Sequence, residues 1–218
     1  DGFFAILKDG SAMIGTKEDY ATYKDQIEEG IGLFGSGKHL VKDGQIVAAD
    51  GGTRASRTAI GIRADGSVVM MVLDGRQEPF SCGGTMAEIA TIMKEAGCVD
   101  AVNLDGGGST TYMSKAEGSD TIKVVNRPSD GYARSVSTSL VAVSTAKSSK
   151  EFDRAIIESD YEYLTAGTSL KMTAIGVNNI GSSAVIPDGA YWTVSDEAVG
   201  SIDENGVFTA TQNGDVTV

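Results

Sequence analysis

The first stretch with helical spacing of apolar residues begins after Thr16. Asp19 stands three residues later, as in a capping box, and apolar side chains then recur at every third or fourth position up to Ile27. Gly30 interrupts this pattern, as a residue beyond a helix end commonly does. The sequence therefore predicts a short amphipathic helix between Thr16 and Gly30.

A second and stronger helical pattern begins at Thr85. Glu88 completes another capping box, and Gly97 stands where a helix commonly ends. The apolar positions between them lie on one face of a helix, so we expect its methionines to be ordinary core residues. These apolar positions are Met86, Ile89, Ala90 and Met93.

Four apolar or alternating runs predict strands, and two Asp-Gly turns predict tight hairpins. The runs are residues 58–62, 67–73, 99–104 and 136–143, and the turns are residues 42–45 and 64–67. Helices and strands in this order indicate an α+β fold, which we expect to contain a mixed sheet with hairpins and flanking helices.

The pattern changes near residue 145, where a short polar stretch follows the last run. Beyond it, threonine and valine alternate between closely spaced turn signals, which predicts an all-β region. Residues 165–174, 191–196 and 201–210 resemble bacterial immunoglobulin-like modules, which implies a small sandwich with Trp192 in its core and a hairpin turn at Asn205-Gly206. We therefore predict a domain over residues 1–145, a linker over 146–154 and an immunoglobulin-like domain over 155–218.

Composition narrows the classes of function. The 218 residues carry a net charge of −12, and residues 151–218 hold 11 acidic against two basic side chains. An acidic surface disfavours nucleic acid, and no apolar run is long enough to predict a transmembrane segment. The chain starts at Asp1 without a signal peptide and stops in a strand-like run, so we expect both domains to be truncated at their outer ends.

Soft metal ligands are scarce in the sequence. Cys82 and Cys98 are expected to be unpaired thiols, and His39 is expected in a loop. A zinc centre would need more ligands than these.

The clearest candidate chemistry lies in the run Asn103-Leu104-Asp105-Gly106-Gly107-Gly108-Ser109-Thr110-Thr111. A buried strand leads into three glycines, whose backbone amides can approach an anion closely because no side chain intervenes. Asp105 would face a cleft at the strand end, and the hydroxyl groups can bind phosphate or sugar oxygens. A glycine triplet can also be an ordinary tight turn, and the run alone does not exclude that.

Six arginines lie between residues 54 and 134, and the planar guanidinium fork suits phosphate oxygens. Two such groups that converge on one site would neutralise a phosphodiester. Most arginines are nevertheless solvated surface charges, and we favour that role for Arg54 and Arg63. The remaining candidates are Arg57, Arg76, Arg127 and Arg134.

Several blocks of residues 1–145 resemble the phosphodiester glycosidase family, in the same order. They are residues 57–61, Asp74-Gly75-Arg76, the helix from Thr85, residues 103–111, Asn126-Arg127-Pro128 and residues 134–138. One departure lies at the start, where Asp1-Gly2-Phe3-Phe4 replaces the asparagine, glycine and aromatic residue that open the family's domain.

The resemblance implies a hydrolase that cleaves the glycosidic bond of sugar-1-phosphodiesters similar to N-acetylglucosamine-1-phosphodiester. The implied partner is a phosphorylated glycan or cell-wall polymer, and the implied location is secreted or on the cell surface. No cofactor is implied, and a divalent cation is not indicated, although carboxylates alone can bind one.

The departing group of such a reaction is a phosphate monoester, so the site needs cations for the growing negative charge and a carboxylate near the anomeric carbon. We assign the carboxylates to Asp105 and Asp74, without deciding which is nucleophile and which is base. Phosphate or substrate binding is assigned to Arg57, Arg76, Gly106, Gly107, Gly108, Ser109, Thr110, Asn126 and Arg134.

Two alternatives belong to other classes of protein. A non-catalytic surface module could bind a phosphate-containing polysaccharide in the same cleft. An actin-like phosphotransferase has a similar phosphate loop, but that fold needs two related subdomains, which about 145 residues without an internal repeat do not supply.

Overall fold

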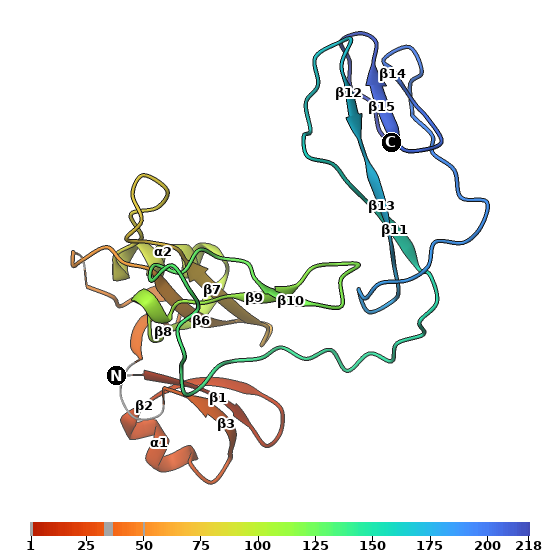
Figure 1. Cartoon of the computed structure of the whole chain (residues 1–218). Helices are drawn as coiled ribbons and strands as arrows, with labels where there is room; N and C mark the ends of the chain where they lie inside the picture. The colour runs from red at the N-terminus through yellow and green to blue at the C-terminus, as the bar shows by residue number, and fades with distance from the viewer. Residues whose placement is uncertain (1, 33–36, 50) are drawn as a thin grey trace. The chain divides into compact units, whose positions relative to one another are not determined.

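The structure is a computed structural model that describes residues 2–32, 37–49 and 51–218 and divides into two compact units (Figure 1). The first unit contains the residues up to Ser114 together with Val124–Ala142. The second contains Lys115–Lys123 and Val143–Val218. No helix in the described residues has the length and apolar character needed to cross a membrane.

A five-stranded sheet in the order β5-β4-β8-β6-β7 forms the centre of the first unit. Every described pair in it is antiparallel, so the expected mixed sheet is wrong. Helix α2 connects β7 to β8, which lies on the other side of β6. Strand β8 therefore runs in the same direction as β7, but it pairs with β6 and β4, which run the opposite way. Three of the predicted strands are confirmed. The strands are β4 (Lys38–Lys42), β5 (Gln45–Ile46), β6 (Arg57–Arg63), β7 (Val68–Leu73) and β8 (Cys98–Asn103).

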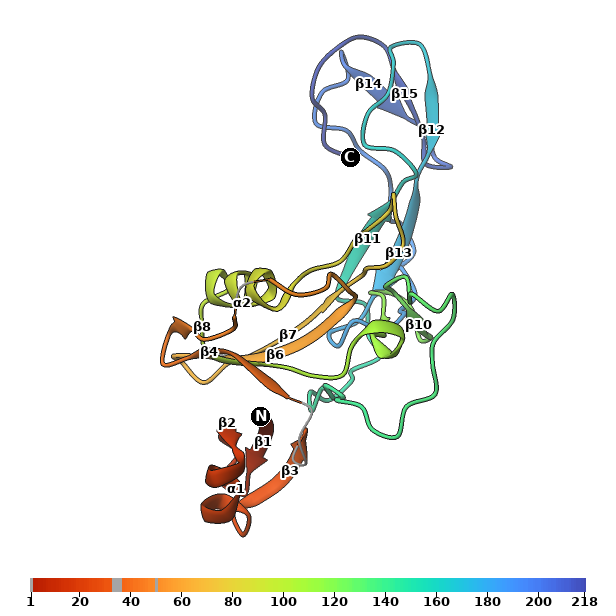
Figure 2. The same ribbon diagram turned by 90° about the vertical axis from the view of Figure 1, so that its left-hand side faces the viewer.

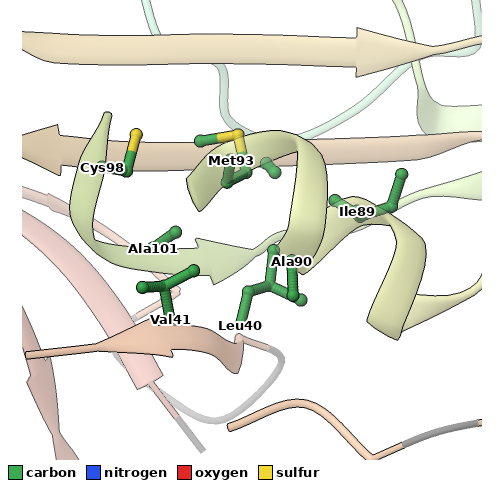
Figure 3. Close-up of a cluster of buried hydrophobic side chains, with 8 residues drawn as sticks. Leu40, Val41, Ile89, Ala90, Met93, Cys98 and Ala101 are labelled. Carbon is green, nitrogen blue, oxygen red and sulfur yellow. The ribbon is translucent and has the colours of Figure 1, made fainter. Parts of the chain in front are cut away.

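Helix α2 (Met86–Glu95) covers one face of this sheet, as Figure 2 shows. The predicted capping box is present: the Thr85 side chain accepts from the Glu88 amide, and the Glu88 carboxylate accepts from the Thr85 amide. Ile89 and Met93 are fully buried, and each contributes about 1.5–3 kcal/mol through burial. They pack with the inward side chains of three strands (Figure 3). The other buried members of this cluster are Leu40, Val41, Ala59, Ala90, Cys98 and Ala101.

A three-stranded sheet in the order β2-β1-β3 packs against the opposite face. Neighbouring residues of β6 and β8 point to opposite faces, so Ile60 and Val102 contact this second sheet while Ala59 and Ala101 face the helix. The middle strands of the central sheet are therefore buried on both sides, while Val68 and Met70 of the edge strand β7 are exposed. The strands are β1 (Gly2–Leu7), β2 (Ala12–Thr16) and β3 (Ile27–Ile31).

Helix α1 (Lys17–Tyr23) has the predicted capping box of Thr16 and Asp19, but it is shorter than expected. Ile27 starts strand β3, which pairs with β1, so the predicted continuation of the helix toward Gly30 is wrong. Backbone pairing with β1 outweighs the helical spacing of the side chains there.

The predicted strand over residues 136–143 is also wrong. No strand is assigned there, every residue of the run is exposed, and none of the described strands pairs with it. An alternating run forms a strand only where another strand supplies hydrogen-bond partners. Strands β9 (Met113–Lys115) and β10 (Ile122–Val124), which precede this region, form a hairpin.

The second unit contains two small antiparallel sheets, β11-β13 and β12-β15-β14. The predicted hairpin turn is confirmed: Gly206 has a φ of +77° and joins β14 to β15. Trp192 is half-buried, and the buried aromatic residue of this unit is Phe208 instead. The strands are β11 (Arg154–Glu158), β12 (Ser169–Lys171), β13 (Thr173–Val177), β14 (Gly200–Ile202) and β15 (Val207–Ala210).

Candidate active site

The glycine triplet lies directly after β8 and is fixed to the start of β6. The Leu104 amide donates to the carbonyl of Thr58 at 2.8 Å, and the Gly107 amide donates to the carbonyl of Ser56 at 2.9 Å. Gly107 has a φ of +62°, a left-handed conformation that favours glycine, and it starts a short 3-10 helix, η1 (Gly107–Ser109). The turn is therefore a fixed feature beside Arg57, the first residue of β6.

Each of the three glycines lies next to one of the predicted arginines. A methyl group at Gly106 would lie 3.7 Å from Cα of Arg57, and one at Gly107 would lie 3.2 Å from Nη1 of Arg76. A methyl group at Gly108 would overlap with the guanidinium of Arg134. The turn thus borders the backbone of Arg57 and the guanidinium groups of Arg76 and Arg134, three arginines that are separated by up to 77 residues in the sequence.

Two of these arginines have no counter-charge among the described residues. Arg57 donates only to carbonyl groups, from Nε to Gly84 at 2.9 Å and from Nη2 to Thr53 at 2.6 Å. Neither Arg57 nor Arg76 forms an ion pair with a residue that the structure describes. Burial, together with the nearby charge of Arg76, lowers the pKa of Arg57 below its ordinary value. The local positive charge is suited to an anionic ligand.

Arg134 is differently placed. It is paired with Asp130 at 2.7 Å, and its Nη1 donates to the Ser109 hydroxyl at 3.4 Å. Sequence analysis missed Asp130, although its spacing of four residues from Arg134 is one at which such pairs form. The Asp130 carboxylate also borders Gly108, so one ion pair covers this end of the turn.

Asp105 is exposed, and its Oδ1 accepts a hydrogen bond from the following amide, that of Gly106, at 2.9 Å. The amides of Gly106 and Gly107 are therefore both occupied within the protein. Thr110 is fully buried, with its hydroxyl bonded to that of Thr58, so the structure does not bring it to the surface of the site. Ser109 remains half-buried beside Arg134.

Asp74, at the end of β7, is half-buried and makes different contacts. Its Oδ1 accepts from Nδ2 of Asn126 at 2.8 Å, and its Oδ2 accepts from the amide of Arg127 at 2.8 Å. Both carboxylate oxygens are thus engaged by the segment that precedes Arg134. Asn126 forms no hydrogen bond with the glycine triplet in the described residues, but it bonds to Thr110 and Tyr112, two and four residues after Gly108.

The surrounding surface contains an open depression of about 530 Å³. Arg76 belongs both to its lining and to the surroundings of the glycine turn. Arg54, predicted as a surface charge, also lines it and forms an ion pair with Glu88. The remaining lining residues are Thr53, Glu78 and Cys82.

The described residues contain no group of three His, Cys, Asp or Glu side chains that could hold a metal ion. Cys82 is exposed and Cys98 is buried, and both are free, as predicted. His39 is not in a loop but in β4, where strand pairing with β8 includes it. Of the predicted family opening, Gly2 and the two phenylalanines lie in β1, while Asp1 is outside the described residues.

Comparison with known proteins supports the resemblance seen in the sequence. The family model described as phosphodiester glycosidase matches residues 1–143. The chain is 37% identical over 109 residues to the SPbeta prophage-derived protein YomE of Bacillus subtilis, covering 47% of this chain and 16% of that protein. It is 36% identical over 59 residues to N-acetylglucosamine-1-phosphodiester alpha-N-acetylglucosaminidase of Mus musculus, covering 27% of this chain and 11% of that enzyme.

The chain therefore spans less than a fifth of the length of these two curated relatives. Among solved structures, the catalytic domain of the zebrafish N-acetylglucosamine-1-phosphodiester alpha-N-acetylglucosaminidase, auto-inhibited by its pro-peptide, is similar at a TM-score of 0.46 and 22% identity. That match covers 59% of this chain and 45% of the zebrafish chain.

Proposed function

The chain belongs to the phosphodiester glycosidase family, and from this premise we propose that it hydrolyses the glycosidic bond of sugar-1-phosphodiesters. The proposed substrates are N-acetylglucosamine-1-phosphodiester-like groups on glycans or cell-wall polymers. The observation that carries the proposal is the meeting of Arg57, Arg76 and Arg134 at one glycine turn, with the first two free of ion pairs among the described residues.

The proposed chemistry follows from where charge develops. When the bond between the anomeric carbon and the phosphate oxygen breaks, negative charge grows on the phosphate while the sugar becomes oxocarbenium-like. We assign stabilisation of the phosphate to Arg57, Arg76 and Arg134, since guanidinium groups bind phosphate oxygens in a fixed fork. Asp105 is an exposed carboxylate of the turn that, unlike Asp130, forms no ion pair with a described residue, and we assign to it the stabilisation of, or attack at, the anomeric carbon.

Replacement of Asp105 tests the carboxylate. Asp105→Asn should reduce release of free sugar from a sugar-1-phosphodiester on the order of 10³–10⁴-fold, as removal of an essential catalytic group does. Asp65→Asn is the matched control, because Asp65 is also an exposed aspartate that accepts a backbone N–H in a turn, the one between β6 and β7. Turnover unchanged by Asp105→Asn would refute the assignment.

Replacement of Arg57 tests recognition of phosphate. Arg57→Ala should lose roughly 10²–10³-fold in kcat/KM with a sugar-1-phosphodiester, and much less with an aryl glycoside that carries no phosphate. Arg63→Ala is the control: Arg63 ends the same strand and likewise donates Nε to a carbonyl, that of Ala96 at 2.8 Å. Equal losses with the two substrates would contradict phosphate recognition.

A binding measurement on the wild type and Arg57→Ala tests the alternative of a non-catalytic binding module. Binding of a phosphate-containing polysaccharide without release of sugar, lost in Arg57→Ala, would favour it over hydrolysis. We further propose that residues 155–218 form an immunoglobulin-like module and that the protein acts in a secreted or cell-surface location. Two small antiparallel sheets in the second unit support the first of these, and localisation by cell fractionation tests the second.

A further inference from the structure

Both carboxylate oxygens of Asp74 are engaged by a segment that is distant in the sequence. Both of its oxygens accept hydrogen bonds at 2.8 Å, one from the side chain of Asn126 and one from the amide of Arg127. Attack on a carbon or capture of a proton would have to compete with these bonds and with the fixed orientation that they impose. In contrast, the Asp105 carboxylate accepts from the amide of its own neighbour, Gly106, and from no other group in the described part of the chain.

We propose that Asp74 is a positioning residue that clamps the segment 126–134 onto the end of β7, and thereby holds Arg134 at the glycine turn. The proposal rests on the proposed function in that Arg134 is taken to serve the reaction. It replaces the catalytic role that the sequence suggested for Asp74.

Both polar atoms of the Asn126 side chain, Nδ2 and Oδ1, form hydrogen bonds in this clamp. Besides the bond to Asp74, Nδ2 donates to the carbonyl of Thr110 at 3.1 Å, and Oδ1 accepts from the amide of Tyr112 at 2.7 Å. The side chain therefore joins the end of β7 to the residues that follow the glycine turn. An amide suits this place because it is a donor and an acceptor at once.

Arg127 adds two more contacts from the loop after β7. Its carbonyl accepts from Nε2 of Gln77 at 2.6 Å, and its guanidinium lies 5.0 Å above the ring of Phe80. The backbone pairing of the preceding hairpin ends at Val125, whose amide donates to the Tyr112 carbonyl at 2.8 Å. The segment 126–134 itself contains no strand or helix, so from Asn126 onward these side-chain contacts hold it in place.

The clamp positions the ion pair of Asp130 and Arg134. Pro128, directly after the clamp, is buried, while every residue from Asp130 to residue 143 is exposed. No strand anchors the chain beyond Arg134, so its place beside Gly108 and Ser109 depends on the anchored side, at Asn126 and Arg127.

A double variant that exchanges the side chains of Asp74 and Asn126 distinguishes a positioning role of Asp74 from a catalytic one. In Asp74→Asn/Asn126→Asp, the new asparagine can donate to the new aspartate and still accept from the Arg127 amide, while the new aspartate can accept from Tyr112. Three of the four hydrogen bonds remain, but the carboxylate now belongs to position 126. A clamp survives this exchange, whereas a nucleophile or base at position 74 does not.

We expect Asp74→Asn alone to lower kcat/KM for a sugar-1-phosphodiester roughly 10- to 100-fold through displacement of Arg134, with the pH profile of kcat unchanged. Asn126→Ala should have a similar effect, and the exchange should restore activity to within about fivefold of the wild type. A loss near 10⁴-fold in Asp74→Asn with no recovery in the exchange would overturn the clamp.

Hydrogen exchange of the Arg127 amide gives a second readout that needs no turnover. The Arg127 N–H should be protected from hydrogen exchange in the wild type, lose protection in Asp74→Ala, and regain it in the double variant Asp74→Asn/Asn126→Asp. If the wild type releases no sugar, the proposed function fails while this measurement still decides the clamp. Equal protection of the Arg127 amide in Asp74→Ala and the wild type would overturn it.

Discussion

Gly108 allows Arg134 to be moved without removing any of its atoms. A methyl group at Gly108 would overlap with the Arg134 guanidinium and with both carboxylate oxygens of Asp130, all of them ends of flexible side chains. In Gly108→Ala the guanidinium must withdraw by about 1 Å to reach ordinary van der Waals separation. A misplacement of about that size can cost roughly 100-fold, so we expect kcat/KM to fall about 10- to 100-fold.

The same change should affect stability little. Gly108 is not among the glycines with positive φ, so alanine fits its backbone, and the loss of unfolded-state entropy favours folding by about 0.4–1 kcal/mol. The displaced ion pair is half exposed and contributes at most about 1 kcal/mol. These effects oppose each other, so we expect the melting temperature to change by less than about 4 °C.

The assay is release of sugar from a sugar-1-phosphodiester, measured beside a thermal melt. Gly66→Ala is the control, since Gly66 has a φ of +84° and open space around it: alanine should cost about 1 kcal/mol there and leave turnover unchanged. In an Arg134→Ala background, Gly108→Ala should have almost no further effect on kcat/KM. Full activity of Gly108→Ala, or a full additional loss in that background, would refute the link between Gly108 and Arg134.

Three further predictions concern the core, the helix start and metal ions. Met93→Ala should lower the free energy of unfolding by about 2–5 kcal/mol in urea denaturation, because Met93 is fully buried between α2 and the sheet; a loss below 1 kcal/mol would contradict this packing. Hydrogen bonding to the Thr85 amide, with help from the charge of Arg54, lowers the pKa of Glu88. The stabilisation is then present above the unfolded pKa of about 4.3 and is lost as the pH falls through the folded pKa, so Glu88→Gln should melt below the wild type at pH 7, by a difference that shrinks on acidification; a difference that does not shrink as the pH falls would argue against it. We propose that arginine side chains, and not a divalent cation, neutralise the phosphate, so dialysis against EDTA should leave release of sugar unchanged; activity restored only by an added divalent cation would refute this.

The elements that the sequence predicted correctly are those in which local signals agree with the tertiary fold. In α2, a capping box, an apolar face and Gly97 indicate the same helix, and the sheet buries that same face. Two of the wrong predictions, the end of the first helix and the strand over residues 136–143, lacked this agreement. Spacing at Ile27 favoured a helix, but β1 was available as a strand partner, and residues 136–143 alternate without such a partner. Neither circumstance is visible within a local window.

In the candidate site, the sequence predicted the types of residue but not their positions. Six arginines suggested a phosphate site, but which of them meet the glycine turn depends on the register of β6 against β8 and on the left-handed φ of +59° at Arg76. Arg63, on the same strand as Arg57, lies at its opposite end and caps the carbonyl of Ala96. Residue type alone does not separate these two arginines, whereas position along the strand does.

The two candidate carboxylates, Asp74 and Asp105, have nearly identical sequence contexts. Asp74 and Asp105 each follow the end of a strand and precede a glycine, so local pattern gives them the same role. Their surroundings differ: Asp74 accepts two hydrogen bonds from a segment more than 50 residues away, and Asp105 accepts one from its own neighbour. A carboxylate bound by distant parts of the chain holds those parts in place, and one bound only locally stays available to a ligand. The difference in role therefore arises from long-range contacts.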